Sequence, residues 1–461
     1  MTLEGGIVAL TPSEIELLDR LYQSLRDSRS QDILLDRYYR GQQRVEELGM
    51  AIPPTMRKFM VITNWCRTLV DTINDRQQVR ALILPGEETA DPALREIWDA
   101  SNLSAHFSMF NIDRMKYGRA FLSVGANEED RDLPLVRVES PREMAALVDV
   151  RQERMIAAGR FYGELKSWGG PSHATLYLPD QTVWLEREGV NGKWVEVDRD
   201  LHNLGVVPVV MHLNRRESGG WAGESHMTDL IPLVDAAARS LTNLQFAQEA
   251  HGVPSLWATG VSQGDFVDAD GKPVPQFEAY FDAIKMLSDK DAKWGQFSAA
   301  DLKNFETALS VYGTQASTVT GFPGRYFGLL AANPPTEGSI RADEARLVRS
   351  VETQNEQVGM TLGWAAALAY RFRTGEWVAG NRVRTDFFDP ATPTVSQRED
   401  ALAKRHSAGV LSREGYWDEL GWSEARKAKE REYLEREALD PVAQQILRQV
   451  NVDVGASADG V

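Results

Sequence analysis

The chain has 461 residues, of which 43% are hydrophobic and 26% charged, and its formal net charge is −16 at pH 7. This length leaves room for about three ordinary domains with hydrophobic cores. The acidic balance argues against a protein that grips nucleic acid or an anionic membrane by its overall charge. No apolar stretch reaches the ~18 residues of a membrane span, and the N-terminus lacks the basic segment of a secretory signal. Cys66 is the only cysteine, which excludes an intrachain disulfide and a cysteine-based zinc site.

Helical patterns dominate the first quarter of the chain. Thr11-Pro12-Ser13-Glu14 is a helix start signal, followed by leucines at helical spacing. We expect two helices within 11–49, the second of them running from Asp32 to Leu48. A further amphipathic helix is predicted at 60–79, and two more between Asp91 and Gly118.

From residue 119 to 214 the apolar pattern changes to alternation, which is typical of strands. The segment Gly189-Val-Asn-Gly192 between two such runs predicts a hairpin turn. Strands are expected at Ala120–Gly125, Leu135–Glu139, Arg160–Trp168, Thr175–Leu178, Val183–Glu188 and Lys193–Val197.

Helices return after residue 222 and include one of unusual length. Ser339 to Phe372 carries apolar residues at steps of three, four or seven, which predicts a helix of about 50 Å. A loop rich in Gly and Pro, Thr314 to Gly338, precedes it, and long loops of this kind tend to be functional or disordered. Other predicted elements are helices at Met227–His251, Ser298–Tyr312, Ser396–Ala408, Ser412–Leu420 and Ser423–Ala438, and strands at Ser255–Val261 and Arg382–Phe388.

The sequence contains no complete catalytic, cofactor-binding or metal-binding motif. Gly260-Val-Ser262-Gln-Gly264 matches the nucleophile-elbow pattern, but the residues after it do not read as the helix that this motif requires. Asp268-Ala-Asp270-Gly271 lacks the remaining ligands of a calcium loop. No phosphate-binding loop is present, and the seven histidines show no i,i+4 pair. We therefore expect no enzyme activity, no catalytic residues, no cofactor and no metal site.

Three separated stretches resemble the portal (head–tail connector) proteins of tailed double-stranded DNA bacteriophages of the siphophage type. They are Leu34-Leu-Asp-Arg-Tyr-Tyr-Arg-Gly-Gln-Gln, with Leu48-Gly-Met-Ala-Ile-Pro-Pro soon after it; Asn333-Pro-Pro-Thr-Glu-Gly-Ser-Ile-Arg-Ala-Asp-Glu-Ala-Arg-Leu; and Ser396-Gln-Arg-Glu-Asp-Ala through Glu419-Leu-Gly-Trp-Ser. The resemblance implies an α+β, predominantly α-helical portal fold with long helices, a β-rich wing portion and a small α/β clip, assembled as a ring.

The resemblance also implies a division of the chain. In order, the expected parts are a wing (1–222, β-rich at 119–214), a first stem helix (223–254), a clip (255–297), a second stem helix (298–313), a tunnel loop (314–338), a wing helix and strand (339–393), and a crown with a disordered tail (394–461). The tunnel loop would approach DNA through Thr320, Gly321, Phe322, Pro323, Gly324, Arg325, Asn333, Pro334 and Pro335. Lys303, Asn304 and Thr307 would line the channel from the stem. Deleting Gly321–Pro335 is expected to spare the fold and the ring but to impair DNA packaging.

The implied function is a passive channel at one capsid vertex, through which double-stranded DNA is packaged and ejected without sequence specificity. Expected partners are eleven further copies in a dodecameric ring, the terminase large subunit, a head–tail adaptor, and the major capsid and scaffolding proteins, with no membrane. The expected location is the virion, after assembly in the host cytoplasm. Arg325 and Lys303 could form basic rings or pairs between subunits. The alternatives are another virion structural protein without a channel, or a serine hydrolase using Ser262.

Overall fold

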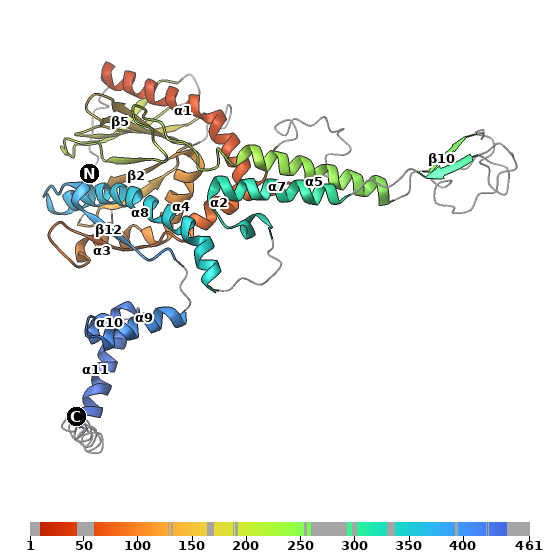
Figure 1. The fold of residues 1–461 in the computed structure, drawn as a ribbon. Helices are drawn as coiled ribbons and strands as arrows, with labels where there is room; N and C mark the ends of the chain where they lie inside the picture. The colour runs from red at the N-terminus through yellow and green to blue at the C-terminus, as the bar shows by residue number, and fades with distance from the viewer. Residues whose placement is uncertain are drawn as a thin grey trace, which may run out of the picture. The chain divides into compact units, whose positions relative to one another are not determined.

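The computed structural model describes residues 10–43, 60–127, 129–130, 132–163, 170–187, 189, 192–252, 256–259, 293–296, 302–329, 337–391, 395–420, 422 and 424–439. The chain is α+β and divides into two compact units, Met1–Pro390 and Ala391–Val461. Figure 1 shows the elements of both. Within the described residues, no helix is both long and apolar enough to cross a membrane.

Helix α1 runs without a break from Pro12 to Arg40, so the prediction of two helices in this region is wrong. The Thr11 hydroxyl accepts a hydrogen bond from the Glu14 backbone, and the Glu14 carboxylate accepts one from the Thr11 backbone, forming a capping box. The helix ends where Gly41 adopts a left-handed conformation (φ 66°). It continues through its polar middle because one buried face spans it, formed by Leu18, Leu21, Asp32, Leu35 and Tyr38.

Three more helices and two small sheets complete the first part of this unit. The helix expected at 60–79 is shorter, because α2 covers only Trp65–Asn74 and the chain then enters strand β1 (Val79–Ile83). The two helices expected between 91 and 118 are confirmed as α3 (Pro92–Ala100) and α4 (Leu103–Tyr117). Strand β1 pairs antiparallel with the distant β12 (Arg384–Phe387). Strands β2 (Arg119–Gly125), β3 (Leu135–Glu139) and β9 (Val209–Leu213) form a sheet in the order β3-β2-β9.

A five-stranded antiparallel sheet in the order β4-β5-β6-β7-β8 lies beneath α1 (Figure 1). The predicted hairpin is confirmed, since β7 and β8 pair with Glu186 opposite Val195. Leu18 and Leu21 of α1 pack with alternating strand residues such as Ala174 and Leu176 in one core cluster. The strands are β4 (Met144–Asp149), which the sequence pattern did not predict, β5 (Arg154–Tyr162), β6 (His173–Tyr177), β7 (Thr182–Glu186) and β8 (Val195–Asp200).

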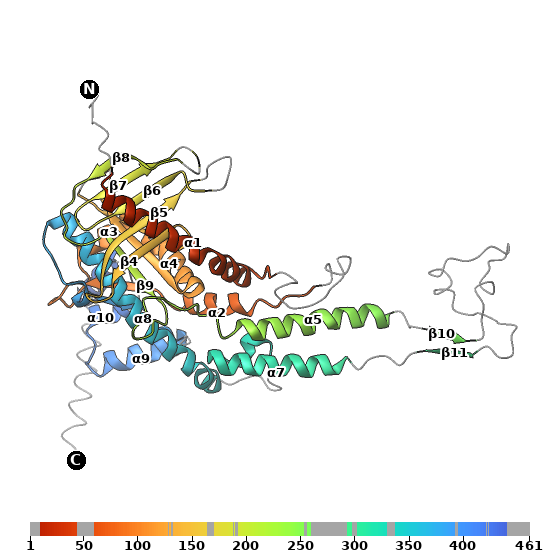
Figure 2. The ribbon, with the colours of Figure 1, turned by 90° about the horizontal axis from the view of Figure 1, so that it is seen from above.

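Helices α5 (Ile231–Gly252) and α7 (Lys303–Thr320) lie side by side, as Figures 1 and 2 both show. Between them in sequence, β10 (Leu256–Thr259) pairs antiparallel with β11 (Lys293–Gln296). Val234 and Ala237 of α5, together with Ala316 of α7, belong to the core cluster that α2 and α8 also enter. Both helices are therefore anchored at one end in the body of this unit.

Helix α8 runs from Glu337 to Thr374 and contains the long helix predicted at 339–372. Its apolar stripe contributes to two core clusters, Leu347 and Val351 to one and Val358, Leu362 and Ala369 to the other. Because α8 contributes to both cores, it connects the α5–α7 region to the β3-β2-β9 sheet.

One buried polar network also ties α8 to the body. The guanidinium of Arg114, only 1% exposed, donates to the side-chain oxygens of Asn111, Asn214, Gln354 and Gln77. Burial lowers the pKa of Arg114 to about 9. Among the described residues no carboxylate bonds to this guanidinium, so side-chain amides alone satisfy a buried cation.

The second unit contains the three helices expected at the end of the chain. They are α9 (Val395–Ser407), α10 (Arg413–Glu419) and α11 (Glu424–Leu439). Trp417 is buried and stacks on Trp422, with ring centroids 5.7 Å apart. Arg431 binds both oxygens of Glu414 at 2.8 Å and so joins α10 to α11.

Candidate functional site

The exposed face of α7 carries no charge over most of its length. Gly313 and Ala316 face the core, and their small size lets neighbouring elements approach. The sequence from 307 to 324 contains no Asp, Glu, Lys or Arg, although 26% of the chain is charged. The exposed residues of this stretch of the helix are Thr307, Ser310, Val311, Thr314, Gln315, Thr318 and Val319.

The threonine hydroxyls on this face are turned back onto the helix. Thr307 donates to the carbonyl of Lys303 at 3.2 Å, Thr314 to that of Ser310 at 2.8 Å, and Thr318 to that of Thr314 at 2.9 Å. Threonine commonly bonds the carbonyl four residues earlier. Because each hydroxyl proton is used inside the helix, these side chains present methyl groups and oxygen lone pairs outward and offer no donor to a bound anion.

The three predicted stem residues lie at the N-terminal end of the same helix. Lys303 and Asn304 are in its first turn and Thr307 follows one turn later, and all three are exposed. They therefore share one element with the uncharged face that begins at Thr307.

Helix α7 continues to Thr320, so the loop predicted from Thr314 begins seven residues too early. The helix continues through Gly313, which is buried against the core, and ends at Gly321, which adopts φ 75°. A Cβ at Gly321 would lie 2.6 Å from the Arg346 Nε, so any other residue here would have to displace the Arg346 side chain. Thr320 is the last helical residue and donates to the carbonyl of Ala316 at 2.7 Å.

Much of the segment that follows is buried. Phe322 is 2% and Phe327 4% exposed, and Pro323 is buried as well. Phe327 contacts Trp65 edge to face, with centroids 5.6 Å apart, while Phe322 contacts Tyr326 at 5.7 Å. The 3-10 helix η3 (Gly324–Phe327) thus belongs to the hydrophobic core, and removing 321–327 would remove core residues. This burial argues against the expectation that deletion of Gly321–Pro335 spares the fold.

Arg325 is paired inside its own chain. Its guanidinium contacts Glu344 of α8 and lies 3.8 Å from Asp343. Glu344 also pairs with Arg76 at 3.3 Å, so two cations share one carboxylate. Pairing with α8 is a third arrangement, different from both the basic ring and the pair between subunits that the sequence suggested.

Several predicted residues lie outside the described part of the chain, namely Asn333, Pro334, Pro335 and Ser262. Only β10 and β11 are described between residues 253 and 301. Among the described residues, no group of three His, Cys, Asp or Glu side chains is arranged to hold a metal ion.

The sequence carried one signal that the prediction did not use. The absence of charge from 307 to 324 marks the exposed face of α7 beyond its first turn, whereas the predicted stem residues stop at Thr307. The amide cage around Arg114 has no such signal, because its members come from segments far apart in sequence.

Comparison with known proteins places the chain in a family. A family model described as phage portal protein, SPP1 Gp6-like, matches residues 18–440. The portal proteins of Mycobacterium phages D29 and L5 are 34% and 33% identical over 415 residues, which cover 87% of this chain and 84% of each relative. Two solved chains are also similar, one from the virion and one from the neck of a native gene transfer agent particle. The matched regions cover 80% of this chain in both cases, and 92% and 94% of the solved chains. The identities are 16% and 14%, and the TM-scores are 0.44 and 0.39.

Those structural likenesses are distant, so the assignment rests on the two sequence comparisons, which agree along most of the chain. They confirm the resemblance carried by the stretches at 34–54, 333–347 and 396–423. The chain belongs to the SPP1 Gp6-like family of phage portal proteins.

Proposed function

We propose that this chain forms a homo-oligomeric ring of twelve copies at one capsid vertex, and that double-stranded DNA enters and leaves the capsid through the ring. The exposed face of α7 lines the channel in this proposal. Family membership supports the role, and the chemistry of that face supports the placement.

The observation that carries the placement is the lack of cationic side chains on α7 from residue 307 onward. Each lysine or arginine that neutralises a DNA phosphate releases counterions and adds to affinity. The face from 307 to 319 has no cation, and three of its hydroxyl protons are used inside the helix. Such a surface lets a polyanion slide, because moving DNA breaks few bonds at each step.

The partly buried segment 320–329 then fixes the start of the loop that continues toward α8. In this proposal the loop reaches DNA through residues beyond Leu329, including Asn333, Pro334 and Pro335. Gly321, Phe322, Pro323 and Arg325 act by fixing the start of the loop to α8 and α2.

The remaining parts of the proposal concern partners and location. The region 255–297 would dock the terminase large subunit and later a head–tail adaptor, while the wing and the crown would contact the major capsid and scaffolding proteins. The ring would assemble in the host cytoplasm and remain at the head–tail junction of the virion. A separate motor would supply the energy, because the sequence holds no phosphate-binding loop.

Electron microscopy of the chain assembled with its capsid partners tests the ring. The proposal predicts rings with a central hole that show no ATP hydrolysis of their own. Ordinary globular monomers under those conditions would contradict it. Esterase activity that is lost in Ser262→Ala would favour the hydrolase alternative.

A further inference from the structure

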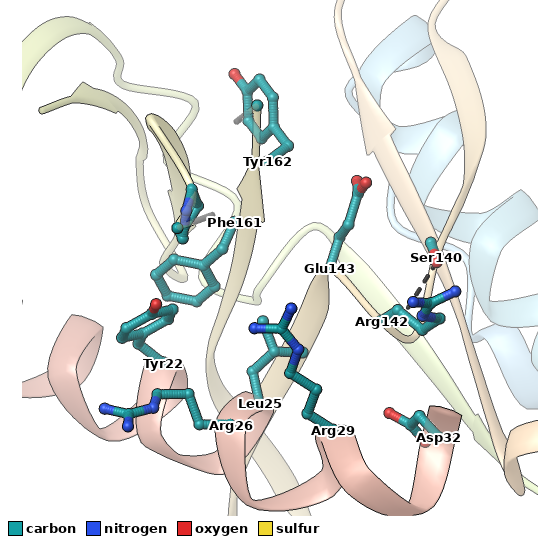
Figure 3. Close-up of a pocket in the computed structure, with 13 residues that line it drawn as sticks. Tyr22, Leu25, Arg26, Arg29, Asp32, Ser140, Arg142, Glu143, Phe161 and Tyr162 are labelled. Atoms are coloured by element: carbon teal, nitrogen blue, oxygen red, sulfur yellow. Dashed lines mark hydrogen bonds between the residues drawn. The ribbon is translucent and has the colours of Figure 1, made fainter. Parts of the chain in front are cut away.

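A basic cavity lies between α1 and the edge of the five-stranded sheet (Figure 3). Its volume is about 410 Å³, in the range of ligand pockets. Arg26 and Arg29 reach it from α1, one helical turn apart, and Arg142 lines it from the turn before β4. Tyr22 and Phe161, with ring centroids 5.1 Å apart, form an aromatic wall.

Both acidic side chains that line this cavity pair with an arginine outside it. Asp32 pairs with Arg119 at 2.7 Å, and Glu143 pairs at 3.2 Å with Arg160, which also pairs with Glu139 at 3.0 Å. In contrast, Arg26 and Arg29 are exposed and form no ion pair with any described residue. Arg26 and Arg29 therefore keep positive charge at the cavity that no described residue pairs with.

Arg142 adds to this unused charge. Its only ion pair among the described residues joins it to Asp36 at 3.9 Å. Asp36 is bound more closely by Lys116 and by Arg40, each at 2.9 Å. Three guanidinium groups thus line one cavity on a protein of net charge −16.

We propose that this cavity binds an acidic peptide segment of a second copy of the chain. Guanidinium groups form bidentate pairs with carboxylates, and two of them one turn apart on a helix match two neighbouring acidic side chains. The cavity is too small to admit a DNA duplex, whereas a pair of acidic side chains fits within it.

The choice of a second copy follows from charge complementarity. The chain has 67 acidic and 51 basic residues, so a second copy offers acidic surface in excess. Glu87 and Glu88, for example, are exposed neighbours that form no ion pair with any described residue. In a cyclic ring, one surface of each copy meets a different surface of the next, which allows a basic cavity to face an acidic segment. This inference rests on the proposed ring.

The first test measures binding of a fluorescent hexaglutamate peptide to the full chain at low salt. We expect Arg29→Glu, and the double variant R26E/R29E, to weaken binding at least tenfold. Arg20→Glu is the matched control, since Arg20 is exposed on the same helix but does not line the cavity; it should stay within twofold of the wild type. Equal binding by R29E and the wild type would overturn the proposal, as would displacement of the peptide by a duplex oligonucleotide at lower concentration.

The second test identifies the source of the acidic segment. Mass photometry of assembled rings in increasing salt should show R26E/R29E rings dissociating at no more than half the salt concentration that the wild type and R20E withstand. If R26E/R29E rings and wild-type rings resist salt equally, a second copy does not occupy the cavity. The portal assignment would be unaffected by that result. Failure of the wild type to form any ring would overturn the proposed function and this occupant together, while the peptide measurement would still decide whether the cavity binds carboxylates.

Discussion

Arg346 of α8 donates a hydrogen bond of 3.0 Å from its Nη1 to the backbone carbonyl of Thr318, in the last turn of α7. The C-terminal carbonyls of a helix lack partners within the helix and attract cations. Arg346 also closes over Gly321, whose backbone leaves no room for a Cβ. This single side chain couples the end of the proposed channel helix to the long helix behind it.

Replacing Arg346 with Ala should therefore lower the free energy of unfolding by about 1 kcal/mol, the usual magnitude for a helix-end contact of this kind. Hydrogen exchange should also quicken in the last turn of α7. Arg349→Ala is the control, because the Arg349 side chain is 73% exposed and pairs only with Glu352 on the same helix among the described residues. Equal exchange in the two variants would show that Arg346 does not hold the junction.

Phe322→Ala should destabilise the protein by about 3 kcal/mol or more, because the ring is buried and its removal leaves a cavity. Urea unfolding followed by tryptophan fluorescence measures the loss. Val311→Ala, at an exposed position of α7, should change stability by less than about 0.5 kcal/mol. A Phe322 variant as stable as the Val311 variant would mean that this segment is not part of the core.

The pKa of Asp113 is raised and that of Asp36 is lowered, so we expect the two side chains to affect stability oppositely as the pH changes. Burial raises the pKa of Asp113 to about 6, against the opposing charge of Lys116 and with help from the charge of Asp36. A raised pKa favours the folded state at low pH, and this advantage is lost as the pH rises through 6. Asp113→Asn should therefore stabilise the protein at pH 7 by about 1–3 kcal/mol and have little effect at pH 4.

Asp36→Asn provides the comparison of opposite sign. Burial alone would raise the pKa of Asp36, but hydrogen bonds and charges from Lys116 and Arg40 outweigh it and hold the pKa below its usual range. Its stabilising contribution is present at neutral pH and is lost as the pH falls through the lowered pKa. Asp36→Asn should thus destabilise the protein at pH 7, with the difference shrinking in acid. Denaturation curves at pH 4, 5.5 and 7 that move in the same direction for both variants would contradict this account.

Adding positive charge to the exposed face of α7 should impair DNA movement. Thr314→Lys with Thr318→Lys places two cations per copy on the stretch 307–319, which now has none, so phosphates would bind and slow translocation. We expect at least a tenfold fall in filled particles, partly relieved by higher salt in a packaging assay in vitro. Thr314→Val with Thr318→Val should package normally, because both hydroxyl protons already bond within the helix. Normal packaging by the lysine variant would contradict the placement of α7 in the channel.

The sequence predicted elements whose signal is local. The apolar stripe of α8, the α3–α4 pair and the β7–β8 hairpin follow from spacing and turn residues that lie within single segments. Each of these patterns is complete within about 40 residues or fewer, so no distant contact is needed to recognise it.

The errors arose where distant residues decide the structure. The polar middle of α1 read as a break, yet Asp32 is buried there because Arg119 pairs with it. Strand β1 forms only because β12 pairs with it from the other end of this unit. The loop before α8 looked entirely flexible from its glycines and prolines, whereas Phe327 packs it against the distant Trp65 of α2. The three arginines of the basic cavity meet only after the sheet has folded against α1.

Photo-crosslinking to DNA in filled particles tests most directly the claim that α7 lines the channel. A photoreactive amino acid at position 314 or 318 should crosslink to DNA in particles that have packaged a genome, and the same residue at position 20 should not. Crosslinking equal to that at position 20, in particles shown to be full, would contradict the claim.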